Sequence, residues 1–100
     1  MTGRQAIEVK LYTRQNCPLC VKAAKFLRSQ ERSWPLVVSS IDIDSDSRLQ
    51  EAYSNCVPVV TVSGKLRFRG QINPVLWQRL MTKELKRAAG LGPKAGPNKG

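Results

Sequence analysis

The stretch Cys17-Pro18-Leu19-Cys20 decides how the rest of this chain is interpreted. Before it, residues 7–12 alternate apolar and polar side chains, which is typical of a β-strand. After it, apolar residues at helical spacing continue to about Ser29. Pro18 suits the first turn of that helix, because its missing N–H would have no partner there. The sequence therefore predicts a strand, a short loop that carries two cysteines, and a helix.

Two cysteines three residues apart on a first helical turn lie on one side of the helix. Their Cα atoms can then come within the roughly 4.4–6.8 Å that a disulfide requires. Cys17 lies nearer the helix start, where unpaired backbone N–H groups and the helix dipole favour a thiolate. Thiol pKa values at such positions fall from about 8.5 to about 3.5–7.5. Cys17 is therefore the predicted nucleophile and Cys20 the predicted resolving thiol, with Arg14 expected to add positive charge nearby.

The remaining pattern predicts three more strands and two more helices. Strands are expected at 36–43, 58–62 and 65–69, the last two joined by a turn at Ser63-Gly64. A short helix is expected to open with a Ser47–Gln50 capping box, and a last helix with Asn73 as N-cap and Pro74 in its first turn. The order β-α-β-α-β-β-α predicts an α/β fold. It is a four-stranded mixed sheet with three flanking helices, in which the first two strands are parallel.

Several finer expectations concern helix ends and side chains. Asn16 is expected to cap the first helix, which should bury Val21, Ala24 and Phe26 or Leu27 on one side. Lys65, Arg67 and Arg69 alternate along one strand, so they are expected to share one solvated face. Trp77 is expected to pack the last helix.

The length and composition fit one small globular domain, with 41% hydrophobic and 24% charged residues in a chain of 100. We place this domain at residues 1–90, with Gly90 as the last helix's C-cap, and expect residues 91–100 to be a disordered basic tail. No apolar run approaches the roughly 18 residues of a membrane span, and the first ten residues lack the apolar core of a secretory signal. A cytoplasmic location away from membranes is therefore expected.

Lysine and arginine outnumber acidic residues by 17 to 7, which gives a net charge of +10, and there is no histidine. The lack of histidine excludes a Cys/His catalytic pair and a Cys₂His₂ zinc site within this chain. The basic residues are scattered and few aromatic residues accompany them. We therefore expect a solvated basic surface that tunes the choice of partner rather than a nucleic-acid site.

These motifs, in this order, resemble the glutaredoxin-like branch of the thioredoxin superfamily over about residues 7–89. A basic residue precedes a Cys-Pro-x-Cys, and Ile41-Asp42-Ile43-Asp44 is similar to the second strand of small bacterial glutaredoxin-like proteins. Cys56-Val57-Pro58-Val59-Val60 resembles the superfamily's Val-Pro segment. The resemblance implies a thioredoxin/glutaredoxin-like fold in which Pro58 is cis and faces the cysteine pair. It also implies that Val57 turns its backbone toward a bound peptide or glutathione.

One segment departs from the glutaredoxin pattern. Glutaredoxins usually carry Gly-Gly and a nearby aspartate after the hairpin, where this chain has Arg69-Gly70-Gln71-Ile72-Asn73. The departure leaves glutathione a candidate co-substrate rather than an established one. The expected substrate-binding residues are Arg14, Val57, Pro58 and Gly70, and no bound cofactor or metal is expected.

The predicted function is that of a thiol–disulfide oxidoreductase, most simply a monomer, which reduces disulfides of proteins or of small molecules. Cys56 is either a small buried apolar residue or a third thiol able to exchange with Cys17. Two alternatives stay open, a non-catalytic binding module of thioredoxin fold and a metal or Fe–S protein that uses the CxxC. Zinc takes about four ligands, so three cysteines would need a carboxylate or a second chain to complete a site.

Overall fold

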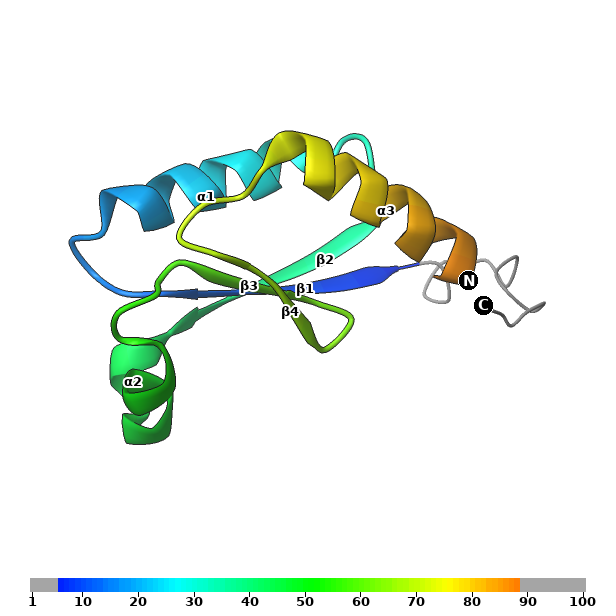
Figure 1. The fold of residues 1–100 in the computed structure, drawn as a ribbon. Coiled ribbons are helices and arrows are strands. Elements are labelled where there is room, and N and C mark those ends of the chain that lie inside the picture. Colours follow the sequence, from blue (N-terminus) through cyan, green and yellow to red (C-terminus); the bar gives the residue numbers. More distant parts are fainter. Residues whose placement is uncertain (1–5, 89–100) are drawn as a thin grey trace.

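The strand that precedes the cysteine pair lies inside a four-stranded sheet in a computed structural model, which describes residues 6–88 (Figure 1). In chain order the elements are β1 (Ile7–Thr13), α1 (Pro18–Gln30), β2 (Leu36–Asp42), the 3₁₀ turn η2 (Ile43–Ser45), α2 (Ser47–Tyr53), β3 (Val59–Val62), β4 (Lys65–Arg69) and α3 (Pro74–Ala88). The predicted order of strands and helices is confirmed, and η2 is the one element that the sequence pattern did not predict.

The strands lie in the order β2-β1-β3-β4. β1 runs parallel to β2, from the pair Ile7–Leu36 to the pair Thr13–Asp42. β3 is antiparallel to both β1 and β4. The mixed sheet with three helices is thus confirmed.

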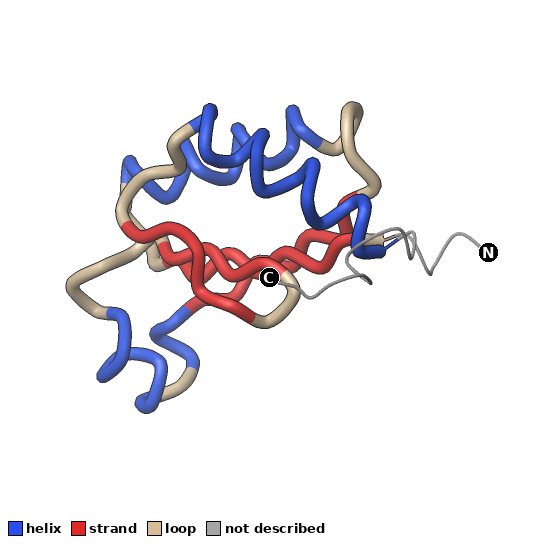
Figure 2. The backbone as a smooth tube through the Cα atoms, turned by 45° about the vertical axis from the view of Figure 1, so that its right-hand side comes forward, coloured by secondary structure: helices blue, strands red, loops and turns tan. Residues whose placement is uncertain are grey.

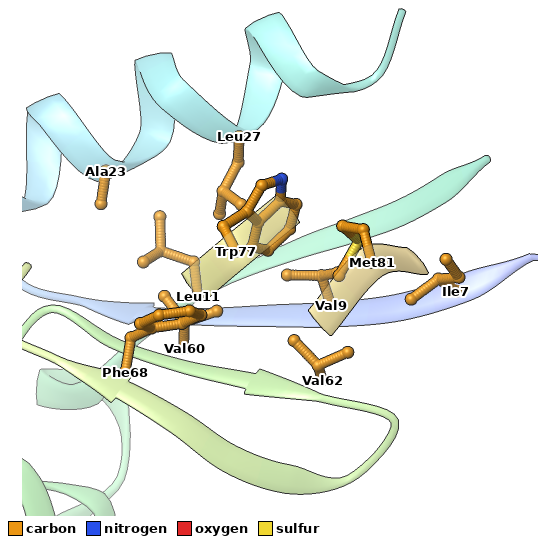
Figure 3. Packing of buried hydrophobic residues seen from close by; sticks show 10 residues of the cluster. All are labelled: Ile7, Val9, Leu11, Ala23, Leu27, Val60, Val62, Phe68, Trp77 and Met81. Carbon is orange, nitrogen blue, oxygen red and sulfur yellow. The ribbon is translucent and has the colours of Figure 1, made fainter. Parts of the chain in front are cut away.

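The helices form two unequal layers. α1 and α3 cover one face of the sheet, whereas α2 lies on the opposite face near one end (Figures 1 and 2). The main core lies between the sheet and the α1/α3 layer (Figure 3). Its buried members are Ile7, Val9, Leu11, Ala23, Leu27, Val60, Val62, Phe68, Trp77 and Met81. Burying a large apolar side chain stabilises a fold by about 1.5–3 kcal/mol, so this layer supplies most of the scaffold that holds α1.

Trp77 joins the two helices of that layer, as expected from its place in the last helix. It is 1% exposed, and its ring meets Phe26 of α1 edge-on at a centroid distance of 5.7 Å. Its indole N–H donates a hydrogen bond to Gln30 Oε1 over 3.0 Å. The helix that carries the cysteines is therefore fixed to α3 as well as to the sheet.

The ends of the helices only partly follow the sequence prediction. Asn73 caps α3 as predicted, since its side-chain oxygen accepts from the N–H groups of Val75 and Leu76. The predicted caps of the other two helices are wrong: Cys17 caps α1 while Asn16 adopts a left-handed φ of 58°, and Asp46, not Ser47, caps α2. The expected C-cap Gly90 and the tail at 91–100 lie outside the described residues.

Two expectations about side chains are also wrong. Val21 is 53% exposed, because the buried stripe of α1 runs through Cys20, Ala23 and Leu27 instead. A bulge in the β3–β4 ladder leaves Arg67 without a partner residue, between the pairs Val60–Phe68 and Thr61–Leu66. As a result Lys65 and Arg69 pair with residues on opposite faces of the sheet, although all three basic side chains are exposed.

Candidate functional site

The cysteine pair lies at the start of α1, where Cys17 is the N-cap of the helix. Its φ of −120° and ψ of 100° are extended, and its Sγ accepts a hydrogen bond from the backbone N–H of Cys20 over 3.1 Å. The two residues form a disulfide, with Cα atoms 5.2 Å apart. A sulfur that replaces the usual oxygen of an N-cap side chain receives one of the N–H groups that a helix start leaves unpaired.

The two cysteines differ in how deeply they are buried. Cys20 is 3% exposed and belongs to the buried stripe of α1, whereas Cys17 is only partly buried. Pro18 and Leu19, which separate the two cysteines, are both exposed. A molecule that approaches from solvent therefore meets Cys17 before Cys20.

The cis proline segment lies at the same end of the sheet as the cysteine loop. Tyr12 pairs with Val59 in antiparallel register, so Pro58 comes next to the end of β1, from which the loop to Cys17 departs. The Val57–Pro58 peptide bond is cis, as the resemblance implies. Figure 1 shows the end of β1, the start of α1 and the start of β3 together at one end of the fold.

Gly70 joins the end of β4 to this same region. Its N–H donates to the carbonyl oxygen of Pro58 over 2.7 Å, and its φ of 79° is one that glycine adopts without strain. The predicted residues Cys17, Cys20, Pro58 and Gly70 are thus carried by segments that meet at one end of the sheet.

Arg14 is held by an acidic residue that the sequence analysis did not assign to the site. Its guanidinium forms two hydrogen bonds with Asp44, Nη2 to Oδ1 at 2.7 Å and Nε to Oδ2 at 3.3 Å. Its Nη1 also donates to the backbone oxygen of Ser54 over 3.4 Å. The expectation that Arg14 adds its charge to the cysteine pair must therefore allow for a carboxylate that already compensates that charge.

The pair changes the titration of both partners. The hydrogen bond from Arg14 holds the pKa of Asp44 below its ordinary value, partly opposed by desolvation and aided by the side-chain amide of Gln50, which donates to Oδ1 over 3.0 Å. The same interaction raises the pKa of Arg14. The contact links the loop before Cys17 to the segment that leads to the cis proline. The signal for it in the sequence was weak, because the two residues are thirty positions apart.

A cleft of about 240 Å³ lies beside the dipeptide between the cysteines. One wall is a face of α1 formed by Leu19, Lys22, Ala23 and Phe26, and the other is the loop Gly70, Gln71 and Ile72. Of these residues only Gly70 was singled out from the sequence. The helical spacing of Leu19, Lys22 and Phe26 was the available signal, since residues three and four positions apart share a helix face.

Cys56 carries a free thiol two residues before Pro58 and is only partly buried. Its N–H donates to the carbonyl oxygen of Tyr53 over 2.9 Å. Across residues 6–88, no three His, Cys, Asp or Glu side chains gather in a way that could hold a metal ion. In the same range, no helix combines the length and apolar character needed to cross a membrane.

Several solved structures are similar to this chain in fold. They include protein Ne2328 from Nitrosomonas europaea, with a TM-score of 0.65 and 24% identity over 75% of this chain and 91% of that one. A mutant thioredoxin from Halobacterium salinarum matches with a TM-score of 0.62 and 17% identity over 79% and 74% of the two chains. A Staphylococcus aureus protein of unknown function, SA0789, gives 0.64 and 17% over 81% and 93%. No curated protein sequence matches the chain.

The fold is therefore thioredoxin-like, and a CxxC lies at the start of its first helix. The sequence is more specific than the fold, because it matches the glutaredoxin-like domain family (DUF836) over residues 8–88. The chain belongs to this family, as its motifs indicated.

Proposed function

We propose that this protein is a thiol–disulfide oxidoreductase in which Cys17 is the nucleophile and Cys20 the resolving thiol. One observation carries the proposal: in a bonded cysteine pair, the sulfur of the less buried residue accepts a backbone N–H at the start of a helix, over 3.1 Å. In the reduced protein, the same N–H and the helix dipole would stabilise a thiolate and lower the pKa of Cys17. The glutaredoxin-like family and the fold support this proposal.

The first chemical step joins the protein to its substrate. The Cys17 thiolate attacks one sulfur of a substrate disulfide, a Cys17–substrate bond forms, and the substrate S–S bond breaks. The leaving substrate sulfur carries away the electron pair and takes up a proton. The partial exposure of Cys17 allows this approach from solvent.

The second step releases the substrate. Cys20 loses its proton and attacks Cys17 Sγ, which breaks the mixed disulfide and leaves the Cys17–Cys20 disulfide. The released substrate sulfur takes up a proton, so one disulfide has become two thiols. The protein has lost two electrons and the proton of Cys20, and solvent has supplied the second proton. A Cα separation of 5.2 Å supports this ring closure, because it falls in the ordinary range for disulfides, about 4.4–6.8 Å.

The backbone around the cis proline is suited to hold an extended substrate. Proline has no N–H, and the carbonyl oxygen of Pro58 already accepts from Gly70, so the free backbone groups of Val57 would contact the substrate as an added strand. Arg14 would act by holding the neighbouring loops through Asp44. We place this monomeric enzyme in the cytoplasm, where thiols are kept reduced, with no bound cofactor.

The decisive experiment uses the pre-reduced protein and a small neutral disulfide in stopped flow. Cys17→Ser should fall to the background rate, whereas Cys20→Ser should stop at a mixed disulfide, visible as added mass on Cys17. Cys56→Ser is the matched control and should keep both steps. Reduction that survives in Cys17→Ser, or a Cys17 thiol that titrates like a free cysteine, would contradict the proposal.

The reductant is tested separately by turnover. One assay supplies glutathione and the other a thioredoxin reductase system, each with the same disulfide. Faster turnover with glutathione would show that Arg69-Gly70 and Asn73 suffice where glutaredoxins have Gly-Gly and an aspartate. Turnover with the reductase system alone would exclude glutathione as the returning thiol.

A further inference from the structure

Acidic and basic side chains are unevenly distributed around the sheet. Asp42, Asp44, Asp46 and Glu51 fall in the segment from the end of β2 through α2, which lies on the face opposite α1 and α3 (Figures 1 and 2). By contrast, residues 18–30 and 65–83 contain no acidic residue. The exposed basic side chains of those two ranges are Lys22, Lys25, Arg28, Lys65, Arg67, Arg69, Arg79 and Lys83. The two walls of the cleft, α1 and the loop of residues 70–72, therefore carry basic side chains and no acidic ones.

The cleft beside the disulfide combines apolar walls with one ammonium group. Leu19, Phe26 and Ile72 supply apolar surface, and the exposed Lys22 lies on the same helix face as Leu19. Leu19 itself is 39% exposed although it separates the two cysteines. An aliphatic side chain next to a substrate cysteine would find apolar contacts there, and an acidic neighbour would find Lys22.

Two more exposed apolar residues lie in the first turn of α3. Val75 is 62% exposed and Leu76 51%, directly after the loop that forms the second cleft wall. Exposed apolar residues that adjoin a functional cleft are typical of an interaction site. None of the aromatic side chains between residues 6 and 88 is exposed, so bases of a nucleic acid would find no stacking platform. This combination favours a polypeptide as the occupant.

We infer that the substrate disulfide belongs to an acidic polypeptide with an aliphatic side chain beside its reactive cysteine. The inference rests on the proposed oxidoreductase function and names its substrate class. The basic side chains of α1 attract the acidic chain before contact, which raises association rates by about 10–10³-fold when charges are complementary. The aliphatic side chain then occupies the cleft and places the substrate sulfur next to Cys17.

The test compares three peptide disulfides that differ only in charge: each has leucine beside the cysteine, flanked by glutamates, by serines or by lysines. Pre-reduced protein is mixed with each in stopped flow, and two protein thiols are oxidised for every peptide disulfide converted to two thiols. At low salt the acidic peptide should react at least about tenfold faster than the neutral one. The lysine peptide should react more slowly than either. The advantage should shrink as ionic strength rises, because salt screens exposed charges.

Variants locate the effect on the cleft side. Lys22→Glu should reduce the ratio of acidic to neutral rates several-fold, while the exposed Arg48→Glu of α2 should leave that ratio unchanged. A further neutral peptide has serine in place of the leucine beside its cysteine. Leu19→Ser should slow the reaction of the leucine peptides more than that of this serine peptide. The matched control Val37→Ser, which removes an exposed valine from β2, should slow neither. Ratios taken against the neutral peptide cancel any change in the reactivity of Cys17 itself.

The outcomes separate this inference from the proposed function. Equal rates for the three peptides, or equal effects of Lys22→Glu and Arg48→Glu, would overturn the acidic substrate while the oxidoreductase stands. A protein that reduces neither the peptides nor a small neutral disulfide would overturn both.

Discussion

The two faces of the sheet are held to their helices by different forces. The face under α1 and α3 is apolar and closed, with Val9 and Met81 at 0% exposure. On the other face, α2 buries no residue at all. It is held by the Tyr12–Tyr53 ring contact, with centroids 5.0 Å apart, and through the Arg14–Asp44 pair, because Asp44 of η2 also accepts from Gln50 of α2 and Arg14 also donates to the backbone of Ser54. Close apolar packing is strong, whereas part-exposed ion pairs are weak. The start of α1, which carries the cysteines, should therefore be rigid, and the segment from α2 to the cis proline should be more mobile.

The largest expected effect comes from disrupting the apolar core between the sheet and the helices α1 and α3. Trp77→Ala removes a side chain that contacts both Phe26 and Phe68 and that bonds Gln30. Truncating a buried aromatic residue costs about 3–5 kcal/mol, so the free energy of unfolding should fall by that amount in urea denaturation. The exposed neighbour Gln78→Ala is the matched control and should change stability by less than about 0.5 kcal/mol. Similar losses for the two variants would refute the assigned core.

A smaller and more local effect is expected on the face of the sheet that carries α2. Arg14→Gln removes the charge that pairs with Asp44, so the amides of α2 should exchange with solvent several-fold faster. Global stability should change little, because both side chains are more than a third exposed to solvent. Hydrogen exchange followed by mass spectrometry measures this, with Arg48→Gln as a control for charge removal on α2. Uniformly faster exchange over α1 as well would show that the two faces are not independent.

The smallest effect is a dependence on acid. The pKa of Asp44 is lower in the folded protein than its ordinary value, so the pair stabilises α2 fully above the unfolded value of about 3.9. That contribution is lost as the pH falls through the lower, folded pKa. Exchange of the α2 amides, corrected for intrinsic rates, should therefore rise below about pH 4. Asp44→Asn should remove this rise, and its persistence there would assign the acid effect to another group.

The sequence predicted the apolar face better than the polar one for a physical reason. Strand alternation and the helical spacing of apolar residues after Cys20 are local properties that burial enforces along the chain, so the order of strands and helices followed from them. The pairing of Arg14 with Asp44 depends on two turns of chain meeting in space, which no local pattern records. The bulge opposite Arg67 and the exposure of Val21 escaped prediction for the same reason, because each depends on the exact register of packed elements.

The residues of the candidate site also fall into two groups, those that local motifs predict and those that only the packed structure brings together. The CxxC and the Val57–Pro58 segment could be found from motifs and spacing, and the cis bond agrees with the resemblance. Lys22 shares a helix face with Leu19 in the sequence pattern, but its place beside Gln71 in one cleft arises only when α1 and the loop after β4 pack together.

Cys17 has two roles, because its sulfur caps the start of α1 and the residue is open enough to solvent to exchange disulfides. Serine would fill the first role, because its hydroxyl is among the preferred groups at a helix start, but it cannot form a disulfide. Alanine would fill neither. A drift from cysteine to serine at this position in related chains would therefore mark proteins that have kept the architecture and given up electron transfer, a distinction that the fold alone does not reveal.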